Sequence, residues 1–114
     1  MSKVSEVSKV SRVNELKSDY RNLEIYKKAK KFRKEIFELI KLFPKEEKFL
    51  LKTQLIRASR SIGANIAEGY GRYHYRENIQ FCRQARGSLY ECLDHINVAY
   101  ECCYIDDEQL LKYE

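Results

Sequence analysis

Residues 22–43 of the chain read NLEIYKKAKKFRKEIFELIKLF, and their apolar side chains recur at the spacing of an α-helix. When successive residues are placed about 100° apart, these side chains fall within an arc of about 160°. The residues on this arc are Ile25, Tyr26, Ala29, Phe32, Ile36, Phe37, Leu39, Ile40 and Phe43. On the opposite arc lie Lys27, Lys34 and Lys41, seven residues apart, with Lys30 and Lys31 beside them. The pattern predicts an amphipathic helix that buries one face and presents a row of ammonium groups on the other.

A second helix is predicted from about residue 45 to residue 68, after the break at Pro44. Its apolar residues form two stripes about 120° apart. One stripe is Leu51, Leu55, Ala58, Ile62 and Ile66, and the other is Phe49, Ile56, Gly63 and Ala67. A surface helix of an isolated monomer needs only one buried face, so a second stripe with small residues indicates close packing on two sides. Oligomerisation and the interior of a four-helix bundle both explain it.

Glycines mark the next boundary. Gly69 and Gly71 interrupt the helical pattern, and Gly69 is suited to cap the second helix with a positive φ. A third helix is predicted from Tyr75 to about Cys103. Gly87 lies on the face opposite its apolar residues, where glycine costs about 1 kcal/mol relative to alanine. We therefore expect another helix to approach closely at Gly87.

The composition fits one small helical domain. A length of 114 residues suits a single domain, and one proline with four glycines is too few for the turns of a β-rich chain. Asp106 or Asp107 can cap a last helix of barely two turns. We predict an all-α, antiparallel up-and-down four-helix bundle over residues 21–114, with a short last helix.

Residues 1–20 form a low-complexity amino-terminal arm that opens with four triplets of the form Ser-x-Val. Their valines recur every three residues, so on an α-helix they drift by about 60° per step and form a spiral. The alternatives are a mobile or partly helical arm and a helix that docks on the bundle or on a neighbouring chain.

Charge is distributed unevenly. Residues 1–76 carry 19 basic and 9 acidic side chains, and residues 77–114 carry 3 and 8, so a net charge of +10 is followed by one of −5. Basic and aromatic residues alternate near the second turn, namely Arg57, Arg60, Arg72, His74 and Arg76 with Tyr70, Tyr73 and Tyr75. Arginine binds phosphate and tyrosine stacks on exposed bases, which indicates nucleic-acid binding. A solvated turn and helix face is the alternative.

The sequence shows no recognisable catalytic, metal or cofactor site. His74 and His95 have no nucleophile or carboxylate in a familiar order, and neither a P-loop nor a dinucleotide-binding fingerprint occurs. The acidic run at residues 106–108 suits a helix cap better than a metal site. We predict a protein that is not an enzyme and takes no metal or cofactor.

Cysteine usage and hydropathy indicate a cytoplasmic protein. The four cysteines, at positions 82, 92, 102 and 103, form no Cys-x-x-Cys pair. Cys82, Cys92 and Cys103 fall among the apolar residues of the third helix, which predicts reduced core cysteines. No apolar run has the length of a signal-peptide core or a membrane span, so we expect no membrane association.

Several blocks of the sequence resemble one bacterial protein family. Residues 54–72 read QLIRASRSIGANIAEGYGR, and Phe81 with residues 85–91 (ARGSLYE) follow. Residues 25–29 (IYKKA) and 43–47 (FPKEE) are similar to earlier blocks of that family. The family is that of the 23S ribosomal RNA intervening-sequence proteins. The resemblance implies an antiparallel four-helix bundle that assembles as a barrel-like homopentamer. It also implies kinship with accessory proteins of diversity-generating retroelements, which bind nucleic acid and associate with a reverse transcriptase.

The shared motif suggests structural roles for four residues: Asn65, Glu68, Gly69 and Gly87. We expect the Asn65 amide to bond a neighbouring helix or the 69–74 turn, because an unpaired buried amide costs about 1–3 kcal/mol. Candidate partners for Glu68 are Arg57, Arg72 and Arg86. The family's fourth helix is normally much longer than the one predicted here. Either an apolar groove stays open in this protein, or the arm from Val4 to Leu16 fills part of it.

Together these observations predict a non-enzymatic, homo-oligomeric helical bundle that binds RNA or DNA through a basic surface. The residues predicted to contact phosphate are Lys27, Lys30, Lys31, Lys34, Lys41, Arg57, Arg60, Arg72 and Arg76. The predicted partners are further copies of the chain, as a pentamer, nucleic acid, and a reverse transcriptase. The alternative function is an oligomeric adaptor or scaffold that binds a protein partner.

Overall fold

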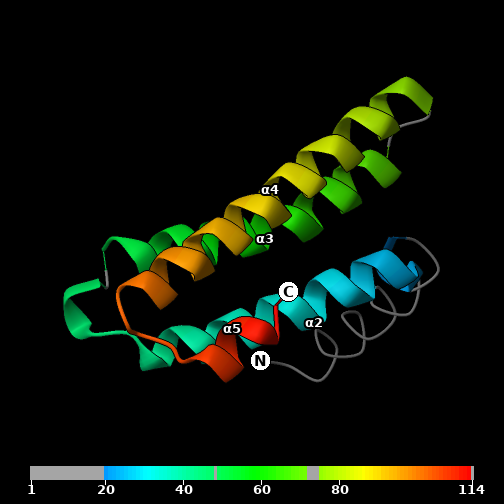
Figure 1. The fold of residues 1–114 in the computed structure, drawn as a ribbon. Helices are drawn as coiled ribbons and strands as arrows, with labels where there is room; N and C mark the ends of the chain where they lie inside the picture. The colour runs from blue at the N-terminus through cyan, green and yellow to red at the C-terminus, as the bar shows by residue number, and fades with distance from the viewer. Residues whose placement is uncertain (1–19, 48, 72–74, 114) are drawn as a thin grey trace, which may run out of the picture.

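The computed structural model describes residues 20–47, 49–71 and 75–113 (Figure 1). Over these ranges the chain is helical and contains no strand, which confirms the predicted all-α fold. The helices are α2 (Glu24–Leu39), α3 (Leu51–Tyr70), α4 (Tyr75–Glu101) and α5 (Asp107–Leu111). Short 3₁₀ segments are η1 (Tyr20–Asn22), η2 (Ile40–Leu42) and η3 (Lys45–Glu47). Apart from Tyr20, the predicted arm at residues 1–20 lies outside the described residues.

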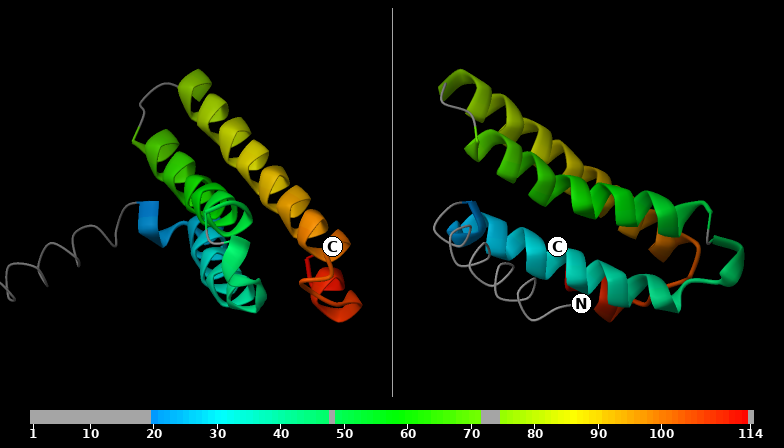
Figure 2. Two further views of the ribbon diagram at one scale, coloured as in Figure 1. Left: turned by 90° about the vertical axis from the view of Figure 1, so that its left-hand side faces the viewer. Right: turned by 180° about the vertical axis from the view of Figure 1, so that it is seen from behind.

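The three long helices run antiparallel in sequence order, and α5 turns back below the end of α4. Helices α3 and α4 lie side by side, α2 lies against α3, and α5 lies near α2 (Figures 1 and 2). The hydroxyls of Ser61 on α3 and Ser88 on α4 are hydrogen-bonded at 2.8 Å. Beyond α5, the ring of Tyr113 meets Phe32 of α2 edge to face, with centroids 6.0 Å apart. Helix α5 therefore occupies a fourth corner, but only part of its length.

The core lies where the three long helices meet. Its most deeply buried side chains come from all of them: Ile36, Leu55, Cys92 and Ile96. The helical spacing predicted which faces are buried. The apolar arc of α2 and the first apolar stripe of α3 both face the core. Each side chain of this size contributes roughly 1.5–3 kcal/mol when buried.

The second apolar stripe of α3 packs mainly within the chain. Gly63 faces α2, where an added Cβ would lie 3.3 Å from Cε2 of Tyr26. Ile56 packs, partly buried, against the core, whereas Phe49 is 81% exposed. Packing inside the bundle therefore explains the stripe at Gly63 and Ile56.

Gly69 does not cap α3 with a positive φ, so that prediction is wrong. The helix continues through Gly69 to Tyr70, and no glycine of the described residues has a positive φ. Gly69 is buried, and an added Cβ would lie 2.9 Å from both Asn78 Oδ1 and Phe81 Cβ of α4. Glycine is needed here because α4 approaches closely.

Helix α3 starts at Leu51, later than predicted, because residues 45–47 form a 3₁₀ turn first. The carboxylate of Glu47 then links two segments. Its Oε2 accepts the backbone N–H of Leu51 at 3.2 Å, and its Oε1 accepts the hydroxyl of Tyr104 at 2.8 Å. One side chain thus satisfies an N–H at the start of α3 and ties this connection to the segment before α5.

The Tyr104–Glu47 hydrogen bond predicts a pH dependence of stability. The bond, together with partial burial, raises the pKa of Tyr104 to about 12, above the ~10 of an unfolded chain. Its stabilisation is therefore complete below about pH 10 and is lost as the pH rises through about 12. We expect the melting temperature of the wild type to fall more between pH 9 and pH 12 than that of Tyr104→Phe. Parallel melting curves against pH would contradict this account.

Helix α4 ends at Glu101 in a Schellman motif. The N–H of Cys103 donates to the Tyr100 carbonyl and the N–H of Tyr104 donates to the Ala99 carbonyl, both at 2.9 Å. Cys103 occupies the left-handed position of this motif with φ 64°, a place where glycine is preferred. The residue is exposed just past the helix and not on its apolar face.

Cys103→Gly is expected to stabilise the protein by about 1 kcal/mol. A left-handed conformation costs a non-glycine residue about 1–2 kcal/mol, and the greater unfolded-state freedom of glycine offsets part of the gain. Urea unfolding followed by circular dichroism measures the change. The matched control is Cys102→Gly, at a neighbour without a positive φ, which should destabilise the protein. A Cys103→Gly variant no more stable than the wild type would contradict the strain at this position.

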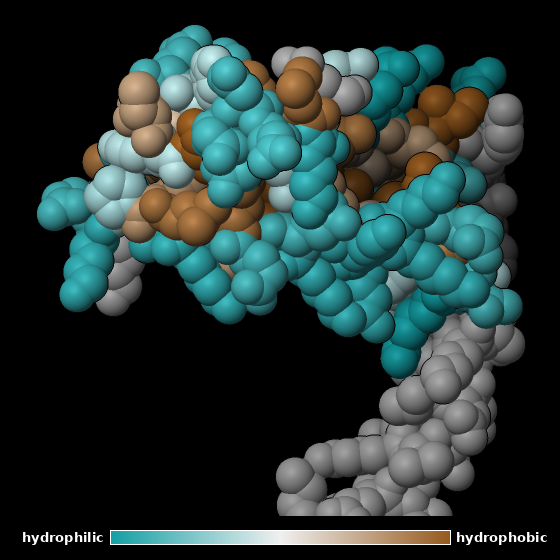
Figure 3. Space-filling model, turned by 60° about the horizontal axis from the view of Figure 1, so that its bottom comes forward, coloured by the Kyte–Doolittle hydropathy of each residue, from teal (hydrophilic) through white to brown (hydrophobic). Residues whose placement is uncertain are grey.

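The cap predicted for the last helix is confirmed at Asp106. Its carboxylate accepts the Gln109 N–H at 2.9 Å, and the Gln109 side chain accepts the Asp106 N–H at 2.7 Å. This capping box starts a helix of only five residues. A helix this short leaves hydrophobic side chains uncovered. Figure 3 shows hydrophobic surface in a hollow between hydrophilic rims.

Candidate nucleic-acid interface

The predicted lysine row lies exposed along α2 and the η2 turn that follows it. All five lysines are on the surface: Lys27, Lys30, Lys31, Lys34 and Lys41. With a rise of about 1.5 Å per residue the row is about 21 Å long. Lys27 lies 3.4 Å from Glu24, and Lys41 lies 3.0 Å from Glu38, in exposed ion pairs. Such pairs contribute only about 0–1 kcal/mol, so a polyanion can compete for these lysines.

Arg57 and Arg60 are exposed on α3, on the side away from its buried residues. Arg60 lies one turn before Gly63, the residue that faces Tyr26 of α2. Arg60 therefore lies close to the border between α3 and α2. The structure adds these two guanidinium groups to the outer surface, as the sequence predicted.

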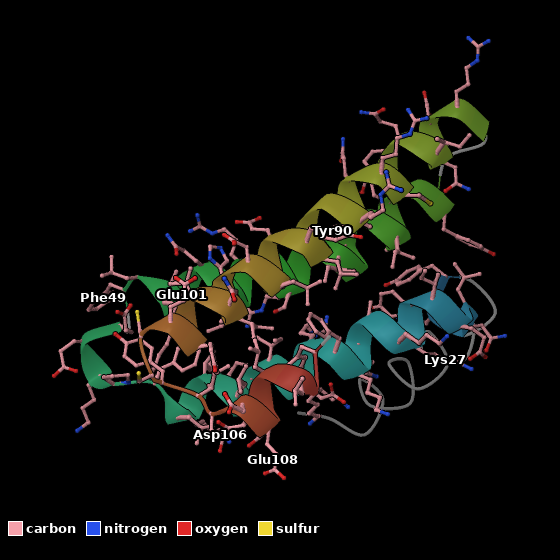
Figure 4. All side chains as sticks on the ribbon, viewed as in Figure 1. Lys27, Phe49, Tyr90, Glu101, Asp106 and Glu108 are labelled. Atoms are coloured by element: carbon pink, nitrogen blue, oxygen red, sulfur yellow. The ribbon has the colours of Figure 1, made fainter. Side chains whose placement is uncertain are left out.

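Helix α4 carries a second basic row that the sequence interpretation largely missed. Arg76, Arg83 and Tyr90 are exposed and lie seven residues apart, which places them on one face of the helix. Arg86 is exposed one turn from both Arg83 and Tyr90. Tyr90, labelled in Figure 4, is 64% exposed. The signal was present in the sequence as the regular spacing 76, 83, 90, of which only Arg76 was singled out.

The guanidinium groups of this row are available for a ligand. Within the described part of the chain, no carboxylate lies within 4.0 Å of Arg76, Arg83 or Arg86. Arg72, Tyr73 and His74 lie outside the described residues, so the predicted aromatic cluster around the second turn is not described as a whole. The row on α4 therefore begins at Arg76.

Acidic residues gather at the other end of the molecule. Glu101, Asp106 and Glu108 lie at the end where α4 gives way to α5, far from Lys27 at the start of α2 (Figure 4). Arg76, Arg83 and Arg86 belong to the first half of α4, beside the start of α2. Lys27 and the α4 arginines thus mark a basic end that attracts polyanions, while the lysine row continues from it to Lys41, towards the end with the acidic residues.

A match to a protein family spans helices α2 to α5. Residues 21–114 match the family of 23S rRNA-intervening sequence proteins. The chain belongs to that family. No curated protein matches the chain.

Asn65, in the motif that carries the family resemblance, is hydrogen-bonded within its own helix. Its amide donates to the Ser61 carbonyl at 2.9 Å and lies 3.0 Å from the Ser61 hydroxyl. The expected direct bond to another helix is therefore replaced by a bond within α3. Among the described residues Asn65 is linked to α4 through Ser61, whose hydroxyl meets Ser88. Residues 72–74 of the other expected partner, the 69–74 turn, lie outside the described residues.

Two other motif residues of this intervening-sequence protein are exposed. Glu68 lies on the surface of α3. Gly87 lies on the surface of α4, and among the described residues no neighbouring atom lies within 4 Å of the position its Cβ would take. Any helix that packs closely on Gly87 must therefore come from outside the described part of this protomer.

The four cysteines of this intervening-sequence protein differ in burial. Burial and the neighbouring Glu91 charge raise the pKa of Cys92 to about 12, so its thiol stays protonated. Cys82, Cys102 and Cys103 are exposed, so the prediction of core cysteines is right only for Cys92.

No group of three potential metal ligands occurs among the described residues. None of the described helices has the length and apolar character needed to cross a membrane.

Proposed function

We propose that this protein binds RNA or DNA without catalysing a reaction, using the exposed row Arg76, Arg83 and Tyr90 with Arg86 as its principal contact. The observation that carries the proposal is the α4 row itself, in which an exposed tyrosine follows three arginines that have no carboxylate within 4.0 Å among the described residues. Guanidinium groups bind phosphate oxygens, and tyrosine rings stack on unpaired bases. Single-stranded or looped nucleic acid fits this combination best.

The lysine row on α2 has a different role in this proposal. Lysines on flexible stems bind phosphate as point charges and give little specificity. Lys30, Lys31 and Lys34, which have no described carboxylate partner within 4.0 Å, extend the positive surface beyond the contact on α4. They raise the rate of encounter and add to the salt dependence of binding.

The test of this function is fluorescence anisotropy with labelled single-stranded RNA and DNA. The chain should bind at low salt and weaken steeply towards physiological salt. Tyr90→Leu should reduce affinity about 5–100-fold because base stacking contributes about 1–3 kcal/mol, and Tyr90→Phe should retain it. No binding at low salt would refute the function, and binding of a protein partner instead would support the adaptor function.

Assembly is the second part of the proposal. Gly87 lies on the same exposed face of α4 as Arg83 and Tyr90, so this assembly is expected to leave that face open to nucleic acid. The family resemblance implies a homopentamer, in which the basic ends would form a ring in the cytoplasm and could recruit a reverse transcriptase. Light scattering should give five subunits for the wild type, and Gly87→Leu should leave that number unchanged. A monomeric wild type would refute the assembly without affecting the binding test.

A further inference from the structure

An apolar groove lies between the start of α2, the end of α3 and the first half of α4. It has a volume of about 740 Å³. Its walls include Leu23, Ile25 and Phe32 on the α2 side, Ile66 on α3, and Cys82 and Leu89 on α4. Ile25, which belongs to the apolar arc of α2, is 61% exposed here. The bundle therefore leaves a core-type surface uncovered at its basic end.

The groove adjoins the segment that follows α5. Tyr113, just beyond α5, packs against Phe32, and Phe32 is also part of the groove wall. Helix α5 ends at Leu111, just before this contact. The groove is thus the part of the fourth corner that α5 does not occupy, and a further helical segment fits it by shape.

The chain itself supplies a segment next to the groove. Tyr20 packs edge to face on Tyr26 with centroids 5.0 Å apart, and Leu23 lines the groove. The 19 residues before Tyr20 therefore join the described structure at the open end of the groove. From Leu23 to Phe32 the groove follows nine residues of α2, or about 14 Å, of which a helical segment of seven residues covers about 10 Å.

Residues 10–16 have the pattern that this groove requires. Val10, Val13 and Leu16 span about 120° on a helix, close to the width of a core-facing stripe. The four residues between them are polar, namely Ser11, Arg12, Asn14 and Glu15. The full series from Val4 to Leu16 spans twice that arc, so its first members cannot face the same groove.

We propose that residues 10–16 dock in this groove as a helical segment and complete the fourth corner of their own protomer. Only three residues separate Leu16 from Tyr20. Such a short tether holds the segment at an effective concentration of the order of mM, which favours it over a segment from another chain. Val10, Val13 and Leu16 contact the apolar walls, and Val4 and Val7 lie beyond the groove.

Cys82 is a natural probe of this docking, because its exposed thiol lines the groove, whereas Cys102 is exposed elsewhere. Alkylation of each thiol by iodoacetamide is timed in the full chain and measured by mass spectrometry. Cys82 should react at least about tenfold more slowly in the wild type than in Val10→Asp/Val13→Asp/Leu16→Asp, because the docked segment must first leave the groove. The matched control Val4→Asp/Val7→Asp should behave as the wild type, and Cys102 should react equally in all three.

A disulfide measurement distinguishes the segment's own protomer from a neighbour. Val13→Cys, oxidised mildly, should form a bond with Cys82 that runs as a single chain on non-reducing gels, and Val4→Cys should not. A dimer-sized product would overturn the proposal by showing exchange between chains. Equal Cys82 reactivity in the wild type and the triple aspartate variant would also overturn it. If Cys82 reacts equally slowly in these two proteins, a second copy of the chain covers the groove instead.

Discussion

Gly69→Ala is expected to destabilise the protein by about 1–3 kcal/mol, as inserting a methyl group into a packed contact does. The new Cβ would lie 2.9 Å from Cβ of Phe81 and from Oδ1 of Asn78. The Asn78 amide can rotate away, but Cβ of Phe81 is fixed to the α4 backbone. Helices α3 and α4 must therefore separate at this contact, and this cost exceeds the gain in helix propensity.

Other glycines of the chain are matched controls for this change. At Gly71 an added Cβ meets only backbone atoms at 3.6 and 3.8 Å, and at Gly87 it meets no described atom within 4 Å. Gly71→Ala should be nearly neutral. Thermal unfolding should give a melting temperature for Gly69→Ala roughly 5–15 °C below the wild type. If Gly69→Ala melts at or above Gly71→Ala, the close approach of α4 at Gly69 is wrong.

Arg76→Ala/Arg83→Ala/Arg86→Ala is expected to weaken nucleic-acid binding about 100-fold at 0.1 M salt. Each contact with a single strand contributes a salt exponent of about 0.7, which is close to a factor of five at that concentration. Three contacts multiply to about two orders of magnitude. The three arginines are exposed, so the substitutions should leave the helical content unchanged, and circular dichroism checks this.

The matched control for the arginine variant is Lys27→Ala/Lys34→Ala/Lys41→Ala, which removes the same charge from α2. Two of these lysines have acidic neighbours at 3.4 and 3.0 Å. We therefore expect a smaller loss of affinity, about tenfold or less. Equal losses in the two variants would show a response to net charge alone, and a larger loss for the lysine variant would move the principal contact to α2.

The helices could be predicted from the sequence because periodicity reports which face is buried. The apolar arc of α2, the inner stripe of α3 and the cap at Asp106 all follow from local spacing. Local spacing cannot report how close two helices come. The sequence therefore predicted Gly69 as a helix cap with a positive φ, whereas the structure places it against Phe81.

The candidate site was predictable only in part for a related reason. Exposure of Cys82 depends on whether a fourth helix covers the first half of α4, which the sequence of α4 does not report. Arg83 and Tyr90 were not predicted as contacts, because the apolar residues around them indicate only that α4 has a buried face. Their seven-residue spacing becomes informative once the buried face of α4 is known.

The central claim is that the α4 row contacts nucleic acid, and its most direct test is the salt dependence of RNA binding by anisotropy. For the wild type, the logarithm of the association constant should fall linearly with the logarithm of salt concentration. In Arg76→Ala/Arg83→Ala/Arg86→Ala the slope should be shallower by about 2, since three contacts each contribute about 0.7. Identical slopes in the two proteins, or no binding by the wild type at the lowest salt, would contradict the account.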